Sequence, residues 1–178
     1  MIDYEVLFRI SYGLYIVCSG DKSRGNGYIC NTVFQITSDP PKFTVVCNKN
    51  NYTAEFIRNS GVFSVSVLNE NAAPELFGRF GFRSGREMDK LEGMNVVYGE
   101  TGAPIVMNDA LAFLEFRLNQ TVDAGTHFLF IADLVRAEMM DATMEPLTYL
   151  AYHQVRKGFA PKNAPTYIEP GKFRGGGG

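Results

Sequence analysis

The sequence feature that most constrains the fold is a set of segments in which apolar and polar residues alternate. The segment at 62–68 reads Val-Phe-Ser-Val-Ser-Val-Leu, so Phe63, Val65 and Val67 share one face and the two serines take the other. A period of two is typical of a β-strand with one buried face. Similar β-branched or aromatic runs occupy residues 14–19, 28–36, 43–47, 111–119 and 128–137. Six strands of this spacing predict a β-barrel or a β-sandwich.

Two short helices are expected between these strands. Residues 51–60 carry apolar side chains at helical spacing, between an asparagine N-cap at position 50 or 51 and Gly61. Residues 73–80 place a proline in the first turn and apolar side chains on one face. Residues 81–100 hold few apolar residues and several charges, which predicts a long loop. Loops of that length in a compact domain are often functional.

Length and composition limit the classes of protein that fit. A chain of 178 residues predicts a single domain, here residues 1–170, followed by a flexible glycine-rich tail at 171–178. The 17 basic and 19 acidic residues give a net charge of -2, which offers no field for a nucleic acid. Neither a signal peptide nor an apolar run of membrane-spanning length is visible, so we expect a cytoplasmic protein without a membrane partner.

The reactive side chains exclude several chemistries. Cys18, Cys30 and Cys47 form no C-x-x-C pair, so neither a structural metal site nor a disulfide framework is expected, and we expect small buried thiols. His127 and His153 lie in no hydrolase or metal-binding motif, and without other evidence each is expected to be a surface or backbone-bonded residue.

Nucleotide-binding motifs of the familiar kinds are also missing. The sequence Gly25-Asn26-Gly27 begins like a dinucleotide-binding turn, but it lacks the third glycine and leads into a strand instead of a helix. A phosphate-binding P-loop motif does not occur. Neither a Rossmann unit nor P-loop nucleotide hydrolysis is therefore expected.

Asn31 and Thr32 interrupt the apolar run at 28–36. Polar groups at the centre of a strand need hydrogen-bond partners, or each costs about 1–3 kcal/mol. They either bond to a neighbouring strand or face a planar, hydrogen-bonding ligand, and the residues alone leave both readings open.

The segment at 48–53 lies where a strand ends and a helix begins. The first turn of a helix offers free N–H groups and a partial positive charge, so Lys49, the Asn51 side chain and the Thr53 hydroxyl together suit a phosphate. Helix capping beside a solvated lysine explains the same residues, and spacing does not separate the two readings.

With these segments in view, the chain resembles the flavin reductase-like family of FMN-binding split β-barrel proteins, which includes flavoredoxin. The resemblance runs from about Phe8 to Tyr167. It rests on the order and spacing of Tyr-Ile-Val-Cys-Ser-Gly at 15–20, Asn-Gly-Tyr-Ile-Cys-Asn-Thr-Val at 26–33 ahead of Asp-Pro-Pro at 39–41, Asn-Lys-Asn-Asn-Tyr-Thr at 48–53, Gly-Val-Phe-Ser-Val-Ser-Val-Leu at 61–68, Phe-Arg-Ser-Gly-Arg at 82–86 with Asp89 and Lys90, and Asp-Ala-Gly-Thr-His-Phe-Leu-Phe at 123–130. The ending, at 152–158 and 161–167, is similar to the flavin domain of high-molecular-weight rubredoxins.

The resemblance implies a mainly β Greek-key split barrel with short helices, which forms a homodimer with FMN near the interface. It assigns to the isoalloxazine strand Asn26, Asn31, Thr32 and Val33, which act largely through backbone groups. It assigns to the phosphate-binding turn Asn48, Lys49, Asn51 and Thr53. It assigns to a loop near the flavin or its phosphate Ser84, Gly85, Arg86 and Lys90. His153 matches a histidine near the nicotinamide in some members, although Gln154 follows it where many members have glycine.

The implied activity needs no catalytic side chain, because a flavin accepts a hydride directly. We expect NADH or NADPH to reduce bound FMN, which passes electrons to a separate acceptor such as a rubredoxin-like protein or free flavin. The acceptor is expected to be a separate molecule because the paired C-x-x-C motifs of a rubredoxin module are missing. One alternative is an FMN-binding electron carrier that a partner protein reduces. Another is a split barrel that holds haem or pyridoxine phosphate.

Overall fold

The computed structural model describes residues 2–172 of the chain. The described elements run in the order η1 (Tyr4–Arg9), β1 (Tyr15–Gly20), β2 (Gly25–Cys30), β3 (Val33–Ser38), β4 (Pro41–Asn48), α1 (Tyr52–Ser60), β5 (Val62–Leu68), α2 (Pro74–Phe82), β6 (Val96–Tyr98), β7 (Pro104–Val106), β8 (Ala110–Asp123), β9 (His127–Met139), α3 (Tyr149–Gln154) and η2 (Pro170–Lys172). The predicted mainly β fold with short helices is confirmed, and each strand run found in the sequence overlaps at least one observed strand.

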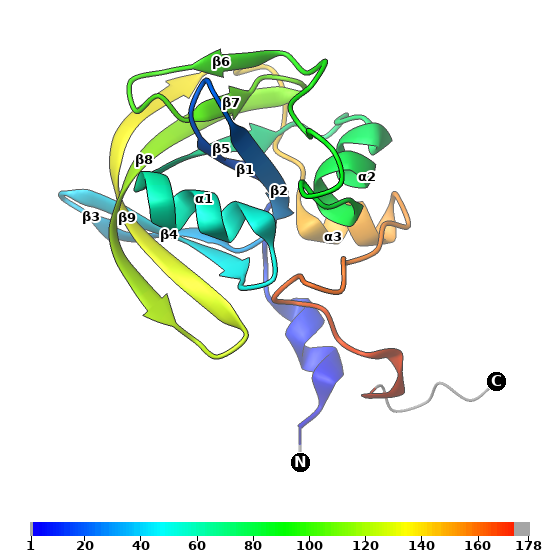
Figure 1. Ribbon diagram of the computed structural model, residues 1–178. Helices are drawn as coiled ribbons and strands as arrows, with labels where there is room; N and C mark the ends of the chain where they lie inside the picture. Colours follow the sequence, from blue (N-terminus) through cyan, green and yellow to red (C-terminus); the bar gives the residue numbers. More distant parts are fainter. Residues whose placement is uncertain (1, 173–178) are drawn as a thin grey trace.

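The main sheet curls into a barrel (Figure 1). Its seven strands pair antiparallel in the order β2-β1-β5-β8-β9-β4-β3. The two edge strands, β2 and β3, follow each other in the chain with only Asn31 and Thr32 between them. The two ends of the sheet must therefore meet, and the Tyr28 hydroxyl of β2 donates to the Val46 carbonyl of β4 (3.0 Å), the neighbour of β3.

The break at Asn31 and Thr32 corrects the prediction of one continuous strand over 28–36. The run contains no glycine or proline after Tyr28, so its composition does not mark a stop. The interruption arises because the chain leaves one edge of the sheet at Cys30 and enters the other at Val33.

The long hairpin of β8 and β9 gives the barrel its curvature. Its register shifts between Glu115 and Phe116 and again between Leu118 and Gln120. Bulges of this kind bend the strand that carries them and increase its twist. The hairpin therefore wraps around the barrel and continues beyond it (Figure 1).

The core has two parts, one on each face of the curled sheet. One part fills the barrel and includes Val17, Phe63, Val65 and Phe116, all fully buried. The other lies between the outer face and helices α2 and α3, and Ile16 from β1 belongs to it. Because neighbouring residues of β1 enter different clusters, β1 is covered on both faces.

Helix α1 covers one end of the barrel. It begins and ends at the predicted caps. The Asn51 side chain accepts a hydrogen bond from the Thr53 N–H (3.1 Å), and Gly61 ends the helix with a left-handed φ of 69°. Ala54 and Ile57 are buried in the barrel cluster. The first turn of α1 is thereby held against the ends of β2 and β4, and this placement positions the site.

The predicted loop at 81–100 is partly wrong. Helix α2 continues to Phe82, and the short strand β6 pairs with β7. The apolar run of β6 is only three residues long, too short to stand out from a polar segment. Of the glycine-rich tail, Gly171 and Lys172 belong to η2, and residues 173–178 lie outside the described residues.

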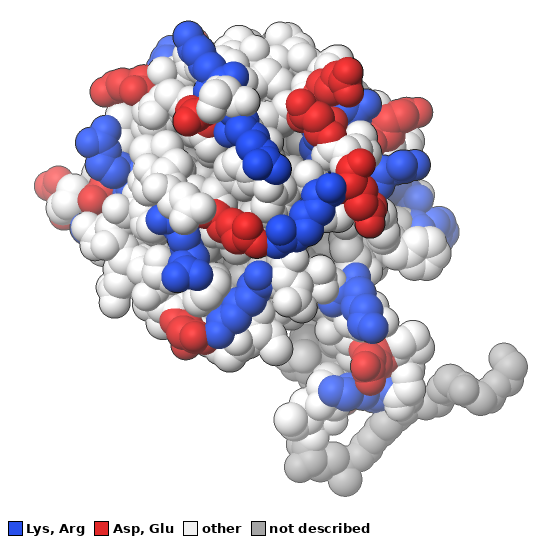
Figure 2. Space-filling model, in the orientation of Figure 1, with Lys and Arg blue, Asp and Glu red and all other residues white. Residues whose placement is uncertain are grey.

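The surface and the remaining side chains add three observations. Lys, Arg, Asp and Glu are interspersed on the face drawn in Figure 2. Within residues 2–172, no helix is long and apolar enough to cross a membrane. The same residues contain no group of three or more His, Cys, Asp or Glu side chains that could hold a metal ion.

Candidate functional site

The main cavity lies where the first turn of α1, the end of α2, the following loop and the C-terminal segment meet. Its volume is about 410 Å³, within the range of about 300–1,000 Å³ that is common for cofactor sites. It is lined by Tyr28, Ile29, Val46, Asn48, Asn50, Asn51, Tyr52, Phe80, Gly81, Phe82, Arg83, Ser84, Gly85, Lys90, Pro161, Lys162, Asn163, Ala164 and Pro165. Among these described residues are three cations and no carboxylate, so the cavity favours an anionic ligand.

The start of α1 supplies amide side chains to the cavity more than free backbone donors. The Thr53 N–H already bonds to the Asn51 side chain, and the Ala54 N–H bonds to the Asn51 carbonyl (3.0 Å). The Asn48 side chain accepts from the Asn50 N–H (2.9 Å). Of the two readings that the sequence left open, helix capping is therefore present. An anion at this position would meet the amide N–H₂ groups of the asparagines and the positive end of the helix dipole.

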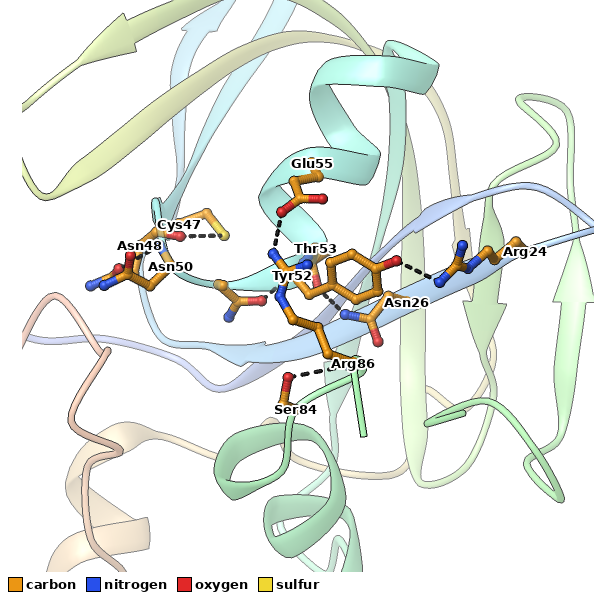
Figure 3. Close-up of polar contacts among 11 residues, drawn as sticks. Arg24, Asn26, Cys47, Asn48, Asn50, Tyr52, Thr53, Glu55, Ser84 and Arg86 are labelled. Atoms are coloured by element: carbon orange, nitrogen blue, oxygen red, sulfur yellow. Dashed lines mark hydrogen bonds and ion pairs between the residues drawn. The ribbon is translucent and has the colours of Figure 1, made fainter. Parts of the chain in front are cut away.

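Asn26 joins three elements behind the cavity wall (Figure 3). Its Nδ2 donates to the Thr53 hydroxyl over 2.9 Å, and both side chains are buried. Gly85 lies so close to the Asn26 Oδ1 that an added Cβ would overlap it. Asn26 therefore holds the loop of Ser84 and Gly85 against the first turn of α1.

Arg86 and Arg24 both contact Tyr52, a residue that the sequence reasoning missed (Figure 3). The Arg86 guanidinium lies 4.2 Å from the centre of the Tyr52 ring and forms an ion pair with Glu55. The Arg86 N–H donates to the Ser84 hydroxyl (3.2 Å). Arg24 donates to the Tyr52 hydroxyl over 2.6 Å. The ring that lines the cavity is thus held from two sides.

Lys90 is a buried cation at the cavity, with 3% of its surface exposed. Its ammonium donates to the carbonyls of Gly27 (3.0 Å) and Phe80 (3.3 Å), and it has no ion pair within the described chain. Burial lowers the pKa of Lys90 from 10.5 to about 8. An ammonium has three N–H donors, so one donor and the charge itself remain for a ligand.

The structure does not bring Lys49 to the cavity. Its ammonium forms an ion pair with Asp123 (2.6 Å), which lowers the pKa of that carboxyl, and lies 4.9 Å from the centre of the Phe128 ring. The Lys49 N–H donates to the Thr126 carbonyl (3.0 Å). Lys49 therefore ties the end of β4 to the tip of the β8–β9 hairpin.

Asn31, Thr32 and Val33 lie at the strand break, outside the lining of the main cavity. Asn31 Nδ2 donates to the Thr166 hydroxyl (2.7 Å), and its buried Oδ1 has no partner within the described chain. Asn31 also lines a smaller, mostly apolar space of about 20 Å³, room for about one water molecule. Val33 pairs with Val45 in the sheet.

His153 lines neither cavity. Its ring packs edge-on against Tyr149, with 4.2 Å between ring centres, and burial lowers its pKa. His127 Nε2 donates to the Asn163 carbonyl (3.2 Å), so His127 is bonded to backbone, as expected. All three cysteines are buried, and burial raises the pKa of Cys18 to about 12, which leaves an unreactive thiol.

The sequence reasoning also missed the far wall of the cavity. Five consecutive residues, 161–165, line it, together with Arg83 from the end of α2. Arg83 directly precedes Ser84, the first loop residue assigned through the resemblance, and the segment at 161–167 contributed to the resemblance. Neither of these sequence features indicates that the segment around Arg83 and the segment at 161–165 face the same cavity.

A split β-barrel with a nucleotide-sized, cationic cavity beside one helix N-terminus defines a class of proteins that bind a phosphorylated cofactor. Comparison with known proteins identifies the family. The model of the flavin reductase like domain matches residues 7–158, so the chain belongs to this family. Family membership confirms the predicted fold and the prediction of a flavin-dependent oxidoreductase that uses a nicotinamide nucleotide.

Two curated relatives match most of the chain. A high molecular weight rubredoxin of Moorella thermoacetica is 49% identical over 93% of this chain and 72% of its own length. A ferric-chelate reductase (NAD(P)H) of Archaeoglobus fulgidus is 44% identical over 94% of this chain and 99% of its own length. Among solved structures, flavoredoxin from Methanosarcina acetivorans is 25% identical with a TM-score of 0.68, over 73% of this chain and 69% of its own.

Proposed function

We propose that the main cavity binds FMN, that NADH or NADPH reduces this flavin, and that the electrons then pass to a separate acceptor. The observation that carries the proposal is the cavity itself, in which Lys90 is buried without a carboxylate partner in the described chain. A buried cation is costly unless something compensates it, and an anionic cofactor would do so.

The residues at the cavity fit a flavin mononucleotide. Its phosphate suits the amide side chains of Asn48 and Asn51 and the turn of Ser84 and Gly85, all of which line the cavity. Lys90 suits an anionic edge of the ring system, since a fixed cation stabilises negative charge that develops there. Asn31, Thr32 and Val33 stay candidates through their backbone groups. Thr53, with no exposed surface, and Asn26 support the site from behind.

When bound, the flavin supplies the centre that accepts a hydride and releases electrons. The chain's part is to bind and orient the two nucleotides. Acid–base groups are scarce at the cavity: its described lining contains no histidine, aspartate or glutamate. This scarcity agrees with a reaction in which the protein moves no proton for the hydride step.

The acceptor is proposed from the relatives. One relative carries the name rubredoxin and the other the name ferric-chelate reductase, so members similar to this chain differ in what receives the electrons. We propose a separate rubredoxin-like protein, with free flavin as the simpler acceptor. The competing function, an electron carrier reduced by a partner protein, uses the same cavity without turnover of NAD(P)H.

We also propose a homodimer with the flavin near its interface. Phe34 and Ile36 on the edge strand β3 are about half exposed, at 52% and 46%, and the short helix η1 buries none of its side chains. Adjacent exposed apolar side chains mark interaction surfaces. In Figure 1, η1 stands away from the barrel on the side where the C-terminal segment runs.

Titration with FMN tests the site. Quenching of flavin fluorescence is expected to show saturable binding to the wild type, and Lys90→Met is expected to weaken it at least tenfold. Lys172→Met, on a lysine that does not line the cavity, is the control. Equal affinity in all three proteins would refute the assignment of the cavity to the flavin.

A further inference from the structure

One wall of the cavity comes from outside the domain that the whole family shares. The family match ends at residue 158, and the segment at 159–167, which we call the strap, follows it. Residues 161–165 of the strap line the cavity. Figure 1 shows the chain after α3 crossing below the barrel at this end. The strap is therefore where this chain can differ from the wider family in what its site accepts.

The strap is fixed to the barrel at two points. The Thr166 hydroxyl receives a hydrogen bond from Asn31 (2.7 Å) and lies 3.0 Å from the Tyr149 hydroxyl. The Asn163 carbonyl receives one from His127 (3.2 Å). Lys162 is adjacent to the second of these points, so its backbone position relative to the cavity is defined.

Two cations of the cavity lining are exposed and have no partner in the part of the chain that the structure describes. Arg83, the C-cap residue of α2, and Lys162 make no ion pair or hydrogen bond within residues 2–172. Arg86 and Lys49, by contrast, are both paired with carboxylates. Because Arg83 and Lys162 line the cavity and are also exposed, they lie at its mouth, where an anion from outside meets them first.

The size of the cavity indicates which anion meets Arg83 and Lys162 at the mouth. A volume of about 410 Å³ lies near the lower end of the range for a single cofactor. It cannot also enclose a dinucleotide. When the nicotinamide reaches the flavin, the remainder of the dinucleotide must therefore extend through the mouth, and its charged part is the diphosphate.

We propose that Arg83 and Lys162 bind the diphosphate of NADH or NADPH at the mouth of the cavity. This inference rests on the proposed function. It adds to that function a role in binding the dinucleotide for Arg83, which follows α2, and for Lys162, which lies in the strap. Charge-assisted hydrogen bonds from such groups to phosphate oxygens are among the stronger polar contacts in proteins.

The test compares the double variant Arg83→Gln/Lys162→Gln with a matched double variant, Arg117→Gln/Lys157→Gln. Arg117 and Lys157 are exposed and line neither cavity, so both variants lose the same charge. Binding of ADP-ribose, which has the diphosphate but no nicotinamide, is measured by calorimetry on the FMN-loaded protein. We expect about tenfold weaker binding only in the first variant.

Kinetics and flavin binding complete the test. We expect the KM for NADH and for NADPH to rise about equally in the first variant, with kcat and the Kd for FMN unchanged. Unchanged ADP-ribose binding, an effect restricted to NADPH, or weakened FMN binding would each overturn the proposal. If the wild type oxidises neither dinucleotide, the proposed function fails instead, and that result is distinct from any difference between variants.

Discussion

Asn26 donates a buried hydrogen bond to the Thr53 hydroxyl across 2.9 Å, and this contact joins β2 to the first turn of α1. Both side chains have 2% or less of their surface exposed. The contact holds the helix N-terminus beside the cavity, so it links the stability of the barrel to the geometry of the site.

Replacing Thr53 by valine keeps the shape of the side chain and removes the acceptor. We expect a loss of about 1–3 kcal/mol in the free energy of unfolding, because the Asn26 amide is left buried without a partner. Urea denaturation measures it. Thr53→Ser retains the hydroxyl and is expected to stay closer to the wild type, so an equal loss in both variants would assign the effect to packing.

Adding one methyl group at Gly85 is expected to weaken FMN binding more than it weakens the fold. A Cβ at this position would overlap the Asn26 side-chain oxygen, and the loop of Ser84 and Gly85 must shift to avoid it. We expect at least a tenfold higher Kd for FMN in Gly85→Ala, measured by fluorescence quenching. Gly61 has open space around it but a left-handed φ, so Gly78→Ala, in open space on α2, is the better control.

The affinity for FMN should depend on pH through Lys90. Its pKa is lowered to about 8, so the ammonium is charged below that pH and neutral above it. An anionic ligand is attracted only by the charged form, so we expect the affinity to fall as the pH rises through about 8. Lys90→Gln should remove this step, and a step that persists in the variant would assign it to another group.

The same shift predicts how the FMN-free protein responds to pH. The pKa of Lys90 in the folded state lies below its ordinary value of 10.5, so between about pH 8 and 10.5 the unfolded chain holds more protons. The free energy of unfolding should therefore rise across this window relative to Lys90→Gln. Chemical denaturation at several pH values measures the difference, and a fall instead of a rise would contradict it.

A charge at the centre of the exposed face of β3 should break the proposed dimer. Phe34→Asp places a carboxylate where an apolar contact between subunits is proposed, and we expect monomers at micromolar concentration by sedimentation velocity. Val97→Asp, on an exposed residue of β6, is the control and should remain dimeric. A monomeric wild type would refute the dimer outright.

The sequence predicted those parts of the fold that depend on local patterns. The segment at 62–68 corresponds residue for residue to β5, and the caps Asn51 and Gly61 bound α1 as expected. The prediction of a single buried face is wrong, because Ser64 and Ser66 are fully buried as well. Asn48, Asn51, Ser84, Gly85 and Lys90, assigned through the resemblance, line one cavity. These residues are in short segments whose order along the chain identifies them.

What could not be predicted depends on contacts between distant segments. The bond between Asn31 and Thr166 spans 135 positions in the sequence, and it ties the strap to the strand break. Lys49 was assigned to the phosphate from its place before a helix and from the resemblance, yet its ammonium forms an ion pair with Asp123, which lies 74 positions further along the chain. No local pattern contains such pairings.

The central claim is tested most directly by the visible absorption spectrum of the FMN-loaded protein under anaerobic conditions, before and after addition of NADH or NADPH. We predict a flavin spectrum that bleaches on addition of at least one of the two. A flavin that binds but stays oxidised would contradict the reductase function and support a carrier reduced by a partner protein. A colourless protein that does not take up FMN would contradict the assignment of the cavity itself.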